Sequence, residues 1–235
     1  MNDLREPTEK RIKQRDTLNR FLDTPVEFLI RHNFTPNIIS YIGLMCSIGA
    51  ALFIAFGTIH LDIWFAWPAP FLIFMAGAFD VFDGEVARRT GKEGPAGAFL
   101  DSNLDRLSDA ILILGLIYGG FVNYFWGFFI LFLCIMISYT RSRAENEGIN
   151  MKGVGLMERA ERVLTLFGVL IIETWVYFIS KLIFGEPWIV FNPLVTSIPV
   201  TWFFLIFIII YISLLIYTLG QRLIYTYNKL NNLES

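Results

Sequence analysis

Four aspartates in this chain have the types and spacing of metal ligands: Asp80, Asp83, Asp101 and Asp105. All four lie in or at the ends of two hydrophobic stretches, where an ionised carboxylate costs at least about 2.5–3.5 kcal/mol. Such a concentration of charge would destabilise membrane helices unless cations neutralised it. Carboxylate oxygens are the ligands that Mg²⁺ and Mn²⁺ prefer. The sequence therefore predicts a divalent-metal site here.

Helical geometry brings the acidic residues together. Each residue of an α-helix advances about 100°, so a set of five residues falls within an arc of roughly 140° on the first helix. These are Asp80, Asp83, Gly84, Ala87 and Arg88. Asp101 and Asp105 lie four residues apart and share a face of the next helix. The connection at 91–97 is short, so the two helices are expected to be antiparallel neighbours whose acidic faces meet.

Small residues and an arginine accompany the aspartates. Gly84, Ala87 and Gly97 leave space for a ligand to approach the backbone, and Arg88 is placed to hold a phosphate. The combination predicts a bound nucleotide or diphosphate with metal. Other interpretations remain open, because single aspartates often cap helices and small residues are common at helix–helix contacts. Asp109, one turn deeper, is expected to have a structural role.

The composition predicts an integral membrane protein. Of 235 residues, 55% are hydrophobic and only 17% are charged, against about 25% charged in average soluble domains. Apolar stretches long enough to cross a bilayer are placed at 37–57, 66–84, 98–119, 122–140, 161–180 and 199–220. The expected fold is therefore all-α, with six transmembrane helices.

The basic residues predict the orientation in the membrane. They gather before the first stretch, beside the second-to-third and fourth-to-fifth connections and after the last stretch, whereas the opposite loops contain only Lys181. Loops rich in Lys and Arg stay in the cytoplasm. We therefore expect a multi-pass cell-membrane protein with both termini and the aspartate site on the cytoplasmic side. The charged N-terminal region lacks the apolar core of a cleavable signal peptide.

The chain divides into a membrane unit and two flanking segments. Residues 1–34 alternate charged with apolar side chains, which predicts an amphipathic juxtamembrane helix on the cytoplasmic membrane surface. A solvated tail is the alternative. Thr35 and Pro36 suit the N-cap and first position of the first span. The expected six-helix domain covers 35–225, and 226–235 is expected to be a cytoplasmic tail.

A second polar cluster flanks the connection between the fourth and fifth spans. The sequence reads SYTRSRAE at 138–145 and ERAER at 158–162. The cluster consists of Ser138, Arg141, Arg143, Arg159 and Arg162, and its four arginines predict an anion site. The alternative is an anchor that touches anionic lipid headgroups.

The aspartate window resembles the CDP-alcohol phosphotransferases, whose pattern is D-x2-D-G-x2-A-R-x8-G-x3-D-x3-D. Every fixed position is filled, without a departure. The resemblance implies a six-helix membrane fold, a homodimer and two Mg²⁺ or Mn²⁺ ions. It also implies transfer of a phospholipid moiety from a CDP-lipid to an alcohol, with release of CMP. Nothing in the sequence predicts a nucleic-acid partner.

The resemblance implies roles residue by residue. Asp80, Asp83 and Asp101 would be the main metal ligands. Asp105 would complete the second ion and act as general base for the acceptor hydroxyl, through its position more than its basicity. The nucleotide would contact Asn37, Asp83, Gly84, Ala87, Arg88 and Gly97. Helix capping explains Asn37 nearly as well.

The arginine cluster resembles the branch of the family that uses inositol phosphate. That branch comprises bacterial phosphatidylinositol-phosphate synthases and archaeal archaetidylinositol-phosphate synthases, which pair S-Y-x-[KR]-x-R-A-E with E-R-x-E-R. By this resemblance the cluster defined above would bind inositol 1-phosphate. The donor would be CDP-diacylglycerol or CDP-archaeol, and the sequence does not decide between these two lipids.

Other functions stay open at this point. The same chemistry could use glycerol 3-phosphate, serine or another alcohol. Intramembrane prenyltransferases also bind diphosphate through Mg²⁺, but usually with aspartates in two separate helix pairs. A divalent-metal transporter is expected to carry acidic residues near mid-membrane on several helices. Here the other spans are almost free of acid, with Glu173 near an outer end as the exception.

Overall fold

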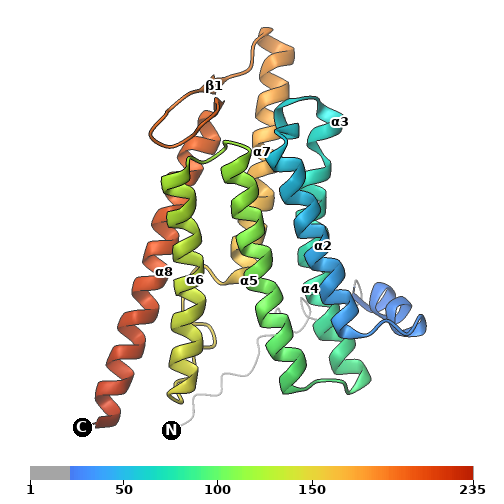
Figure 1. Cartoon of the computed structure of the whole chain (residues 1–235), viewed down its shortest axis with the longest axis vertical. Coiled ribbons are helices and arrows are strands. Elements are labelled where there is room, and N and C mark those ends of the chain that lie inside the picture. The colour runs from blue at the N-terminus through green and yellow to red at the C-terminus, as the bar shows by residue number, and fades with distance from the viewer. Residues whose placement is uncertain (1–21, 235) are drawn as a thin grey trace, which may run out of the picture.

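The computed structural model describes residues 22–234 and is mostly helical (Figure 1). A first helix covers residues 22–31. The remaining elements are α2 (Pro36–Ala55), η1 (Thr58–His60), α3 (Ile63–Ala66), α4 (Pro68–Thr90), α5 (Pro95–Tyr118), α6 (Tyr124–Asn146), α7 (Arg159–Phe184), β1 (Ile189–Val190), β2 (Val200–Thr201) and α8 (Trp202–Glu234). The six long helices correspond in order to the six predicted apolar stretches. Residues 1–21, most of the predicted N-terminal segment, lie outside the described residues, as does Ser235.

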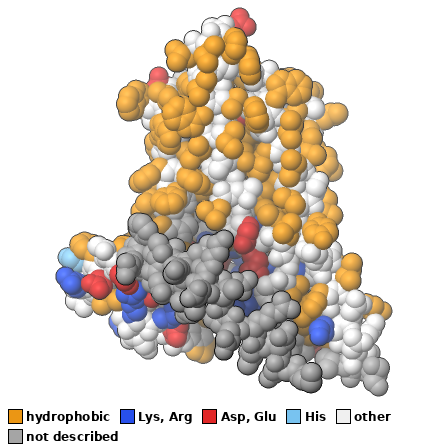
Figure 2. All heavy atoms as spheres, turned by 180° about the vertical axis from the view of Figure 1, so that it is seen from behind, with side chains coloured by type: hydrophobic (Ala, Val, Ile, Leu, Met, Phe, Trp, Pro, Cys, Tyr) orange, Lys and Arg blue, Asp and Glu red, His pale blue; other side chains and the backbone are white. Residues whose placement is uncertain are grey.

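Five described helices are long and apolar enough to cross a membrane. They are α2, the segment Ile63–Thr90, α6, α7 and the segment Trp202–Asn232. The helix α5, which contains Asp101, Asp105, Arg106 and Asp109, is not among them. Figure 2 shows apolar side chains spread over the upper part of one face and charged ones gathered at its lower end. The chain is therefore a multi-pass membrane protein by length and composition of its helices.

Helix α2 lies against both α4 and α5 and makes with them the most extensive contacts in the structure. Two glycines on α5 permit this approach. A Cβ atom at Gly115 would lie 2.8 Å from the Cα of Ala51, and one at Gly119 would lie 2.3 Å from the carbonyl oxygen of Ile54. Helices α4 and α5 make few direct contacts, because α2 fills much of the space between them, yet their acidic faces meet as predicted. Their side chains still converge near the connecting loop.

The helix ends follow from local sequence. The Thr35 side chain accepts a hydrogen bond from the backbone N–H of Ile38, and Pro36 begins α2, as predicted. Helix α4 ends at Gly91, whose φ of +64° lies in the left-handed region that glycine tolerates. Helix α8 runs on to Glu234, so the described part of the predicted tail continues the last helix instead of leaving it.

The helix of residues 22–31 packs on the membrane unit. Val26 and Leu29 are buried in one cluster with Ile39 of α2 and Val86 of α4. Arg89 of α4 also donates to Asp23 at 2.6 Å. Its apolar side therefore contacts protein, while Phe28 remains 57% exposed. Residues 22–31 are thus helical, and the amphipathic helix predicted for residues 1–34 on the membrane surface stays a prediction.

A short antiparallel pair, β1 and β2, closes the end of the bundle opposite the α4–α5 connection (Figure 1). Each strand has only two residues, too few for an alternating pattern from which the sequence could predict it. The neighbouring Glu173 is fully buried. It accepts hydrogen bonds from the Thr201 backbone N–H at 3.0 Å and from the Thr201 hydroxyl, and contacts His60 Nε2 at 2.8 Å.

Candidate active site

Three of the four predicted metal ligands form one compact group. Asp80 of α4 and Asp101 and Asp105 of α5 each offer a carboxylate oxygen, and these oxygens lie within 4.8 Å of one another. All three side chains are partly exposed. The group therefore has the oxygen-only ligands, the spacing and the access that a hard divalent cation requires. The structure thus brings three of the four predicted aspartates together as a group that could hold a metal ion.

Asp83 lies beside this group but has a different partner. Its carboxylate accepts a hydrogen bond from the Ser40 hydroxyl of α2 at 2.5 Å, and the residue is only 6% exposed. All four aspartates nevertheless line one narrow cavity between α2, α4 and α5. The close α2 packing thus places Ser40 against the acidic residues, a contact that the helical spacing alone did not reveal.

Arg159, the first residue of α7, also lines this narrow cavity. Its guanidinium forms ion pairs with Asp80 and, at 2.9 Å, with Asp105. An arginine is cationic at any pH of interest. In this structure Arg159 therefore partly neutralises the group of carboxylates.

A cavity of about 210 Å³ extends from the acidic group along α4 toward the α4–α5 connection. It is lined by most of the predicted nucleotide contacts, namely Asn37, Asp83, Gly84, Ala87 and Gly97. A Cβ atom at Gly84 or Gly97 would meet no described atom within 4 Å. The open space argues that these glycines do not serve a helix–helix contact.

Arg88 is the predicted nucleotide contact that the structure does not bring into this cavity. Its side chain is 60% exposed and pairs with Glu85 at 2.5 Å. Glu85 also accepts from Arg89 at 2.8 Å. The two neighbouring arginines therefore share one carboxylate on the exposed side of α4.

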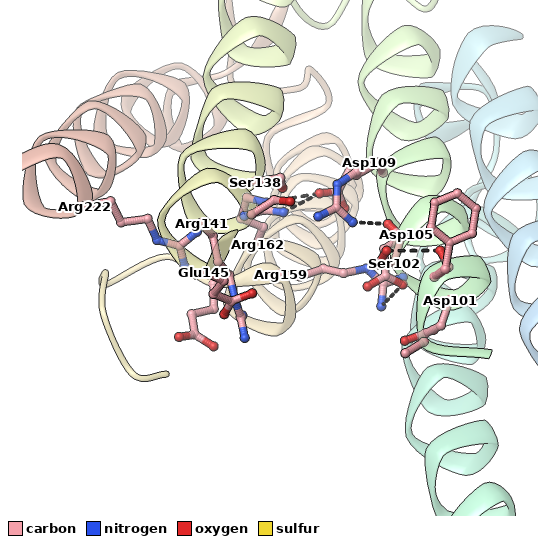
Figure 3. Close-up of a pocket in the computed structure, with 15 residues that line it drawn as sticks. Asp101, Ser102, Asp105, Asp109, Ser138, Arg141, Glu145, Arg159, Arg162 and Arg222 are labelled. Atoms are coloured by element: carbon pink, nitrogen blue, oxygen red, sulfur yellow. Dashed lines mark hydrogen bonds and ion pairs between the residues drawn. The ribbon is translucent and has the colours of Figure 1, made fainter. Parts of the chain in front are cut away.

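A larger cavity of about 490 Å³ opens on the other side of the acidic group (Figure 3). Asp101 and Asp105 form one wall, and Arg159 reaches toward them from α7. The remaining predicted anion-site residues that line it are Ser138, Arg141 and Arg162. The cavity therefore has a negatively charged wall of carboxylates and a positively charged wall of arginines.

Arg143 is not among the residues that line this cavity. It pairs with Glu147 at 2.5 Å, and its side chain is 62% exposed. Arg141, two residues earlier on α6, pairs with Glu145, and both of these side chains line the cavity. Residues two apart on a helix point in different directions, so the two arginines cannot serve one site equally.

Arg162 is held firmly at the cavity wall. It donates to Asp109 of α5, with its Nη2 atom 2.5 Å from a carboxylate oxygen, and to the carbonyl of Met157 at 3.3 Å. Arg162 is 4% exposed. Buried charges of this kind need a paired partner. Asp109 therefore positions Arg162 against the cavity.

Arg222 of α8 is a cavity residue that the sequence analysis missed. Its Nε atom donates to the carbonyl of Val154 at 2.9 Å, and its Nη1 atom donates to the carbonyl of Ile137 at 2.8 Å. It packs against Gly155, where a Cβ atom would lie 2.9 Å from the Arg222 Nε. The sequence analysis counted Arg222 only as a basic residue after the last span and did not place it beside the α6–α7 connection. The available signal was its position four residues after Thr218, because the two polar residues share one face of the apolar helix α8.

Comparison with known proteins identifies the family. The sequence model of the CDP-alcohol phosphatidyltransferase family matches residues 33–192, more than half of the chain. The chain belongs to this family.

Two relatives of this chain are named for inositol-containing lipids. The chain is 47% identical over 95 residues to the archaetidylinositol phosphate synthase of Methanothermobacter thermautotrophicus, and the match covers 40% of this chain and 48% of that protein. The chain is 32% identical over 158 residues to the phosphatidylinositol phosphate synthase of Mycobacteroides abscessus, and this match covers 64% of this chain and 68% of that protein. The matched part spans about half the length of the archaeal relatives.

Solved structures share the fold of this family member. The crystal structure of Mycobacterium tuberculosis phosphatidylinositol phosphate synthase with CDP-DAG bound superposes with a TM-score of 0.65. Sequence identity is 24%, and the match covers 88% of this chain and 94% of that one. The same protein in complex with manganese and citrate also gives a TM-score of 0.65. At this identity the likeness shows the fold.

Proposed function

We propose that this protein transfers a phospholipid moiety from a CDP-lipid to inositol 1-phosphate and releases CMP. The donor would be CDP-diacylglycerol or CDP-archaeol. The observation that carries the proposal is the cavity of about 490 Å³ that joins Asp101 and Asp105 to arginines from three other helices. A metal-bound diphosphate and an anionic acceptor need such opposite charges next to each other.

The residues present fit a metal centre. Asp80, Asp101 and Asp105 would hold divalent ions, and Asp83 would complete the predicted set of four ligands around two Mg²⁺ or Mn²⁺ ions. When bound, these cations would neutralise the diphosphate and stabilise the CMP that leaves. Ser40 would orient Asp83 through its hydrogen bond of 2.5 Å.

The chain's own groups would perform the transfer by positioning and proton removal. The acceptor hydroxyl oxygen would form a bond to the phosphorus attached to the lipid, and the bond from that phosphorus to the oxygen of CMP would break. Asp105 would accept the hydroxyl proton. Asp105 lies at the boundary of the acidic group and the large cavity, which is where an acceptor and donor would meet.

The two cavities would separate the substrates. The smaller one would take the nucleotide between Asn37 and the open faces of Gly84 and Gly97, with Arg88 as the predicted outer phosphate contact. The larger one would take the acceptor, whose phosphate would meet Ser138, Arg141, Arg159, Arg162 and Arg222. Several arginines suit a phosphate dianion better than a neutral alcohol. Arg143 stays a predicted contact.

The membrane arrangement completes the proposal. Helix α5 would be the sixth span, since its length matches a bilayer and its polar residues face the site. Both termini and the active site would lie on the cytoplasmic side, with residues 1–34 along the membrane surface, 35–225 as the membrane domain and 226–235 at its end. The working unit would be a homodimer.

The test is an assay of CMP release. The purified protein with Mg²⁺ and a CDP-lipid would be given inositol 1-phosphate, glycerol 3-phosphate, free inositol or serine in parallel. Release that depends on inositol 1-phosphate and disappears in Asp105→Asn supports the proposal. Release with glycerol 3-phosphate alone would overturn the acceptor, and no release with any acceptor would overturn the reaction.

A further inference from the structure

We infer that Arg159 is a movable counter-ion that couples metal binding to acceptor binding. It pairs with Asp80 and Asp105, and cations bound by the same carboxylates would replace it, so that its guanidinium turns toward the acceptor phosphate. This inference rests on the proposed function for the identity of the acceptor. Its metal-binding part needs only the contacts that Arg159 makes in this structure.

The position of Arg159 carries the first step. It lines both the narrow acidic cavity and the large cavity, so one side chain borders the metal-binding group and the arginine-rich space. Asp101 and Asp105 share this double position, but they are the anions that would hold the metal. Arg159 is thus the cation at the boundary between the two binding spaces, as Figure 3 shows.

The charges carry the second step. Arg159 binds Asp80 and Asp105, two of the three residues that offer oxygens to a metal ion. Carboxylates within 4.8 Å of one another repel strongly unless a cation lies among them. A divalent ion supplies more charge than a guanidinium and uses the same oxygens. Arg159 and metal therefore compete for this group.

The freedom of Arg159 carries the third step. Its Nε atom is buried and has no hydrogen-bond partner among the described residues. Arg162 and Arg222, the two buried arginines of the cavity, differ because each donates to backbone carbonyls. Arg162 and Arg222 are fixed, whereas Arg159 is held by the carboxylates alone and is released when these take another cation.

The consequence is positive coupling between metal and acceptor. Without metal, the guanidinium that the acceptor phosphate needs is engaged by Asp80 and Asp105. With metal, it becomes available on the side of the large cavity. By linkage, the acceptor must then strengthen metal binding by the same factor as metal strengthens acceptor binding.

The first experiment measures binding of Mn²⁺ alone, by electron paramagnetic resonance of the free ion, with no lipid or acceptor present. The wild type would be compared with Arg159→Met, which keeps length and removes charge, and with Arg159→Lys. The matched control is Arg106→Met, which removes a positive charge from the same cavity wall without breaking an ion pair to Asp80 or Asp105.

We expect Arg159→Met to bind Mn²⁺ about tenfold more tightly than wild type, within the usual range of coupling. Arg106→Met should change the affinity much less, and Arg159→Lys should lie near wild type.

Equal or weaker Mn²⁺ binding by Arg159→Met would overturn the competition. An equal gain in Mn²⁺ affinity in Arg106→Met would also overturn the competition, because the gain would then follow from removing any nearby positive charge. Should Arg159→Met fail to fold, Arg159→Gln takes its place as the variant without charge, and Arg159→Lys stays the variant that keeps the charge. This measurement needs no turnover, so it stands or falls separately from the proposed reaction.

The second experiment measures binding of inositol 1-phosphate by calorimetry with and without Mn²⁺. We expect Mn²⁺ to tighten binding about tenfold in wild type and much less in Arg159→Met. An undiminished gain in Arg159→Met would overturn the coupling. If wild type binds no inositol 1-phosphate but Arg159→Met still binds Mn²⁺ more tightly, the counter-ion role holds and the proposed acceptor fails.

Discussion

Glu173 and the Asp80–Asp101–Asp105 group place carboxylates on long helices at opposite ends of the molecule, and their hydrogen-bonding needs are met in different ways. Glu173 is fully buried, and both of its oxygens contact His60 or Thr201. The three aspartates are partly exposed and crowd together within 4.8 Å. Among the described residues, the ion pairs of the group come from the single side chain of Arg159.

The comparison shows that carboxylates can serve either structure or cation binding. A carboxylate that is surrounded by donors fixes neighbouring elements, here η1, α7 and β2. Carboxylates that lack enough donors and border a cavity keep their capacity to bind a cation. Functional groups of this kind commonly reduce stability, so mutations at the two places should have opposite effects on folding and activity.

The largest expected effect is the loss of activity in Asp105→Asn. Removal of a general base costs about 10²- to 10⁴-fold in rate, and we expect CMP release to fall by that factor. The free energy of unfolding should stay equal or rise, because the change relieves repulsion with Asp80 and Asp101. Activity and thermal unfolding in detergent would be measured together. A variant that loses stability along with activity would break the contrast with Glu173.

Divalent metal should stabilise the aspartate end. A ligand that binds only the folded state contributes about 2.7 kcal/mol at a concentration of 100 times its Kd, so saturating Mg²⁺ or Mn²⁺ should raise Tm and EDTA should reverse the rise. Asp101→Asn should abolish most of this shift. Glu173→Gln should keep it, and equal loss in both variants would contradict a metal site confined to the aspartates.

Glu173→Leu should weaken the opposite end of the molecule. It leaves the Thr201 N–H and hydroxyl without their acceptor, and an unsatisfied buried group costs about 1–3 kcal/mol. We expect a lower free energy of unfolding, measured by thermal denaturation. The kcat of the fraction that remains folded should be unchanged. A fall in kcat at a temperature where the variant is fully folded would show that this cluster acts on the active site.

The smallest effect is expected for Arg143→Ala. Its ion pair with Glu147 is largely exposed, and such pairs contribute about 0–1 kcal/mol. The free energy of unfolding should therefore fall by no more than about 1 kcal/mol, and the KM for inositol 1-phosphate should stay close to the wild-type value. Arg141→Ala is the matched comparison, because Arg141 lines the large cavity and its loss should raise KM. Equal changes in KM would restore Arg143 to the acceptor site.

The sequence predicted the helices and the acidic group because length, apolarity and spacing are local properties. Helical periodicity places Asp101 and Asp105 on one face whatever else the fold does. It does not say which helix faces which, so the intervening position of α2 and the Ser40–Asp83 contact could not be predicted. Arg222 was missed for the same reason, since its partners Ile137 and Val154 belong to distant parts of the chain.

The attachment of the helix at 22–31 affects how this protein can be shortened or fused. Val26 and Leu29 cover Val86, which lies one turn from Asp83 on α4. Asp23 holds Arg89 of the same helix. A chain trimmed to start at the first membrane helix would expose Val86 and loosen the segment of α4 that carries Asp80 and Asp83. Purification handles therefore belong upstream of residue 22, with the helix that follows left intact.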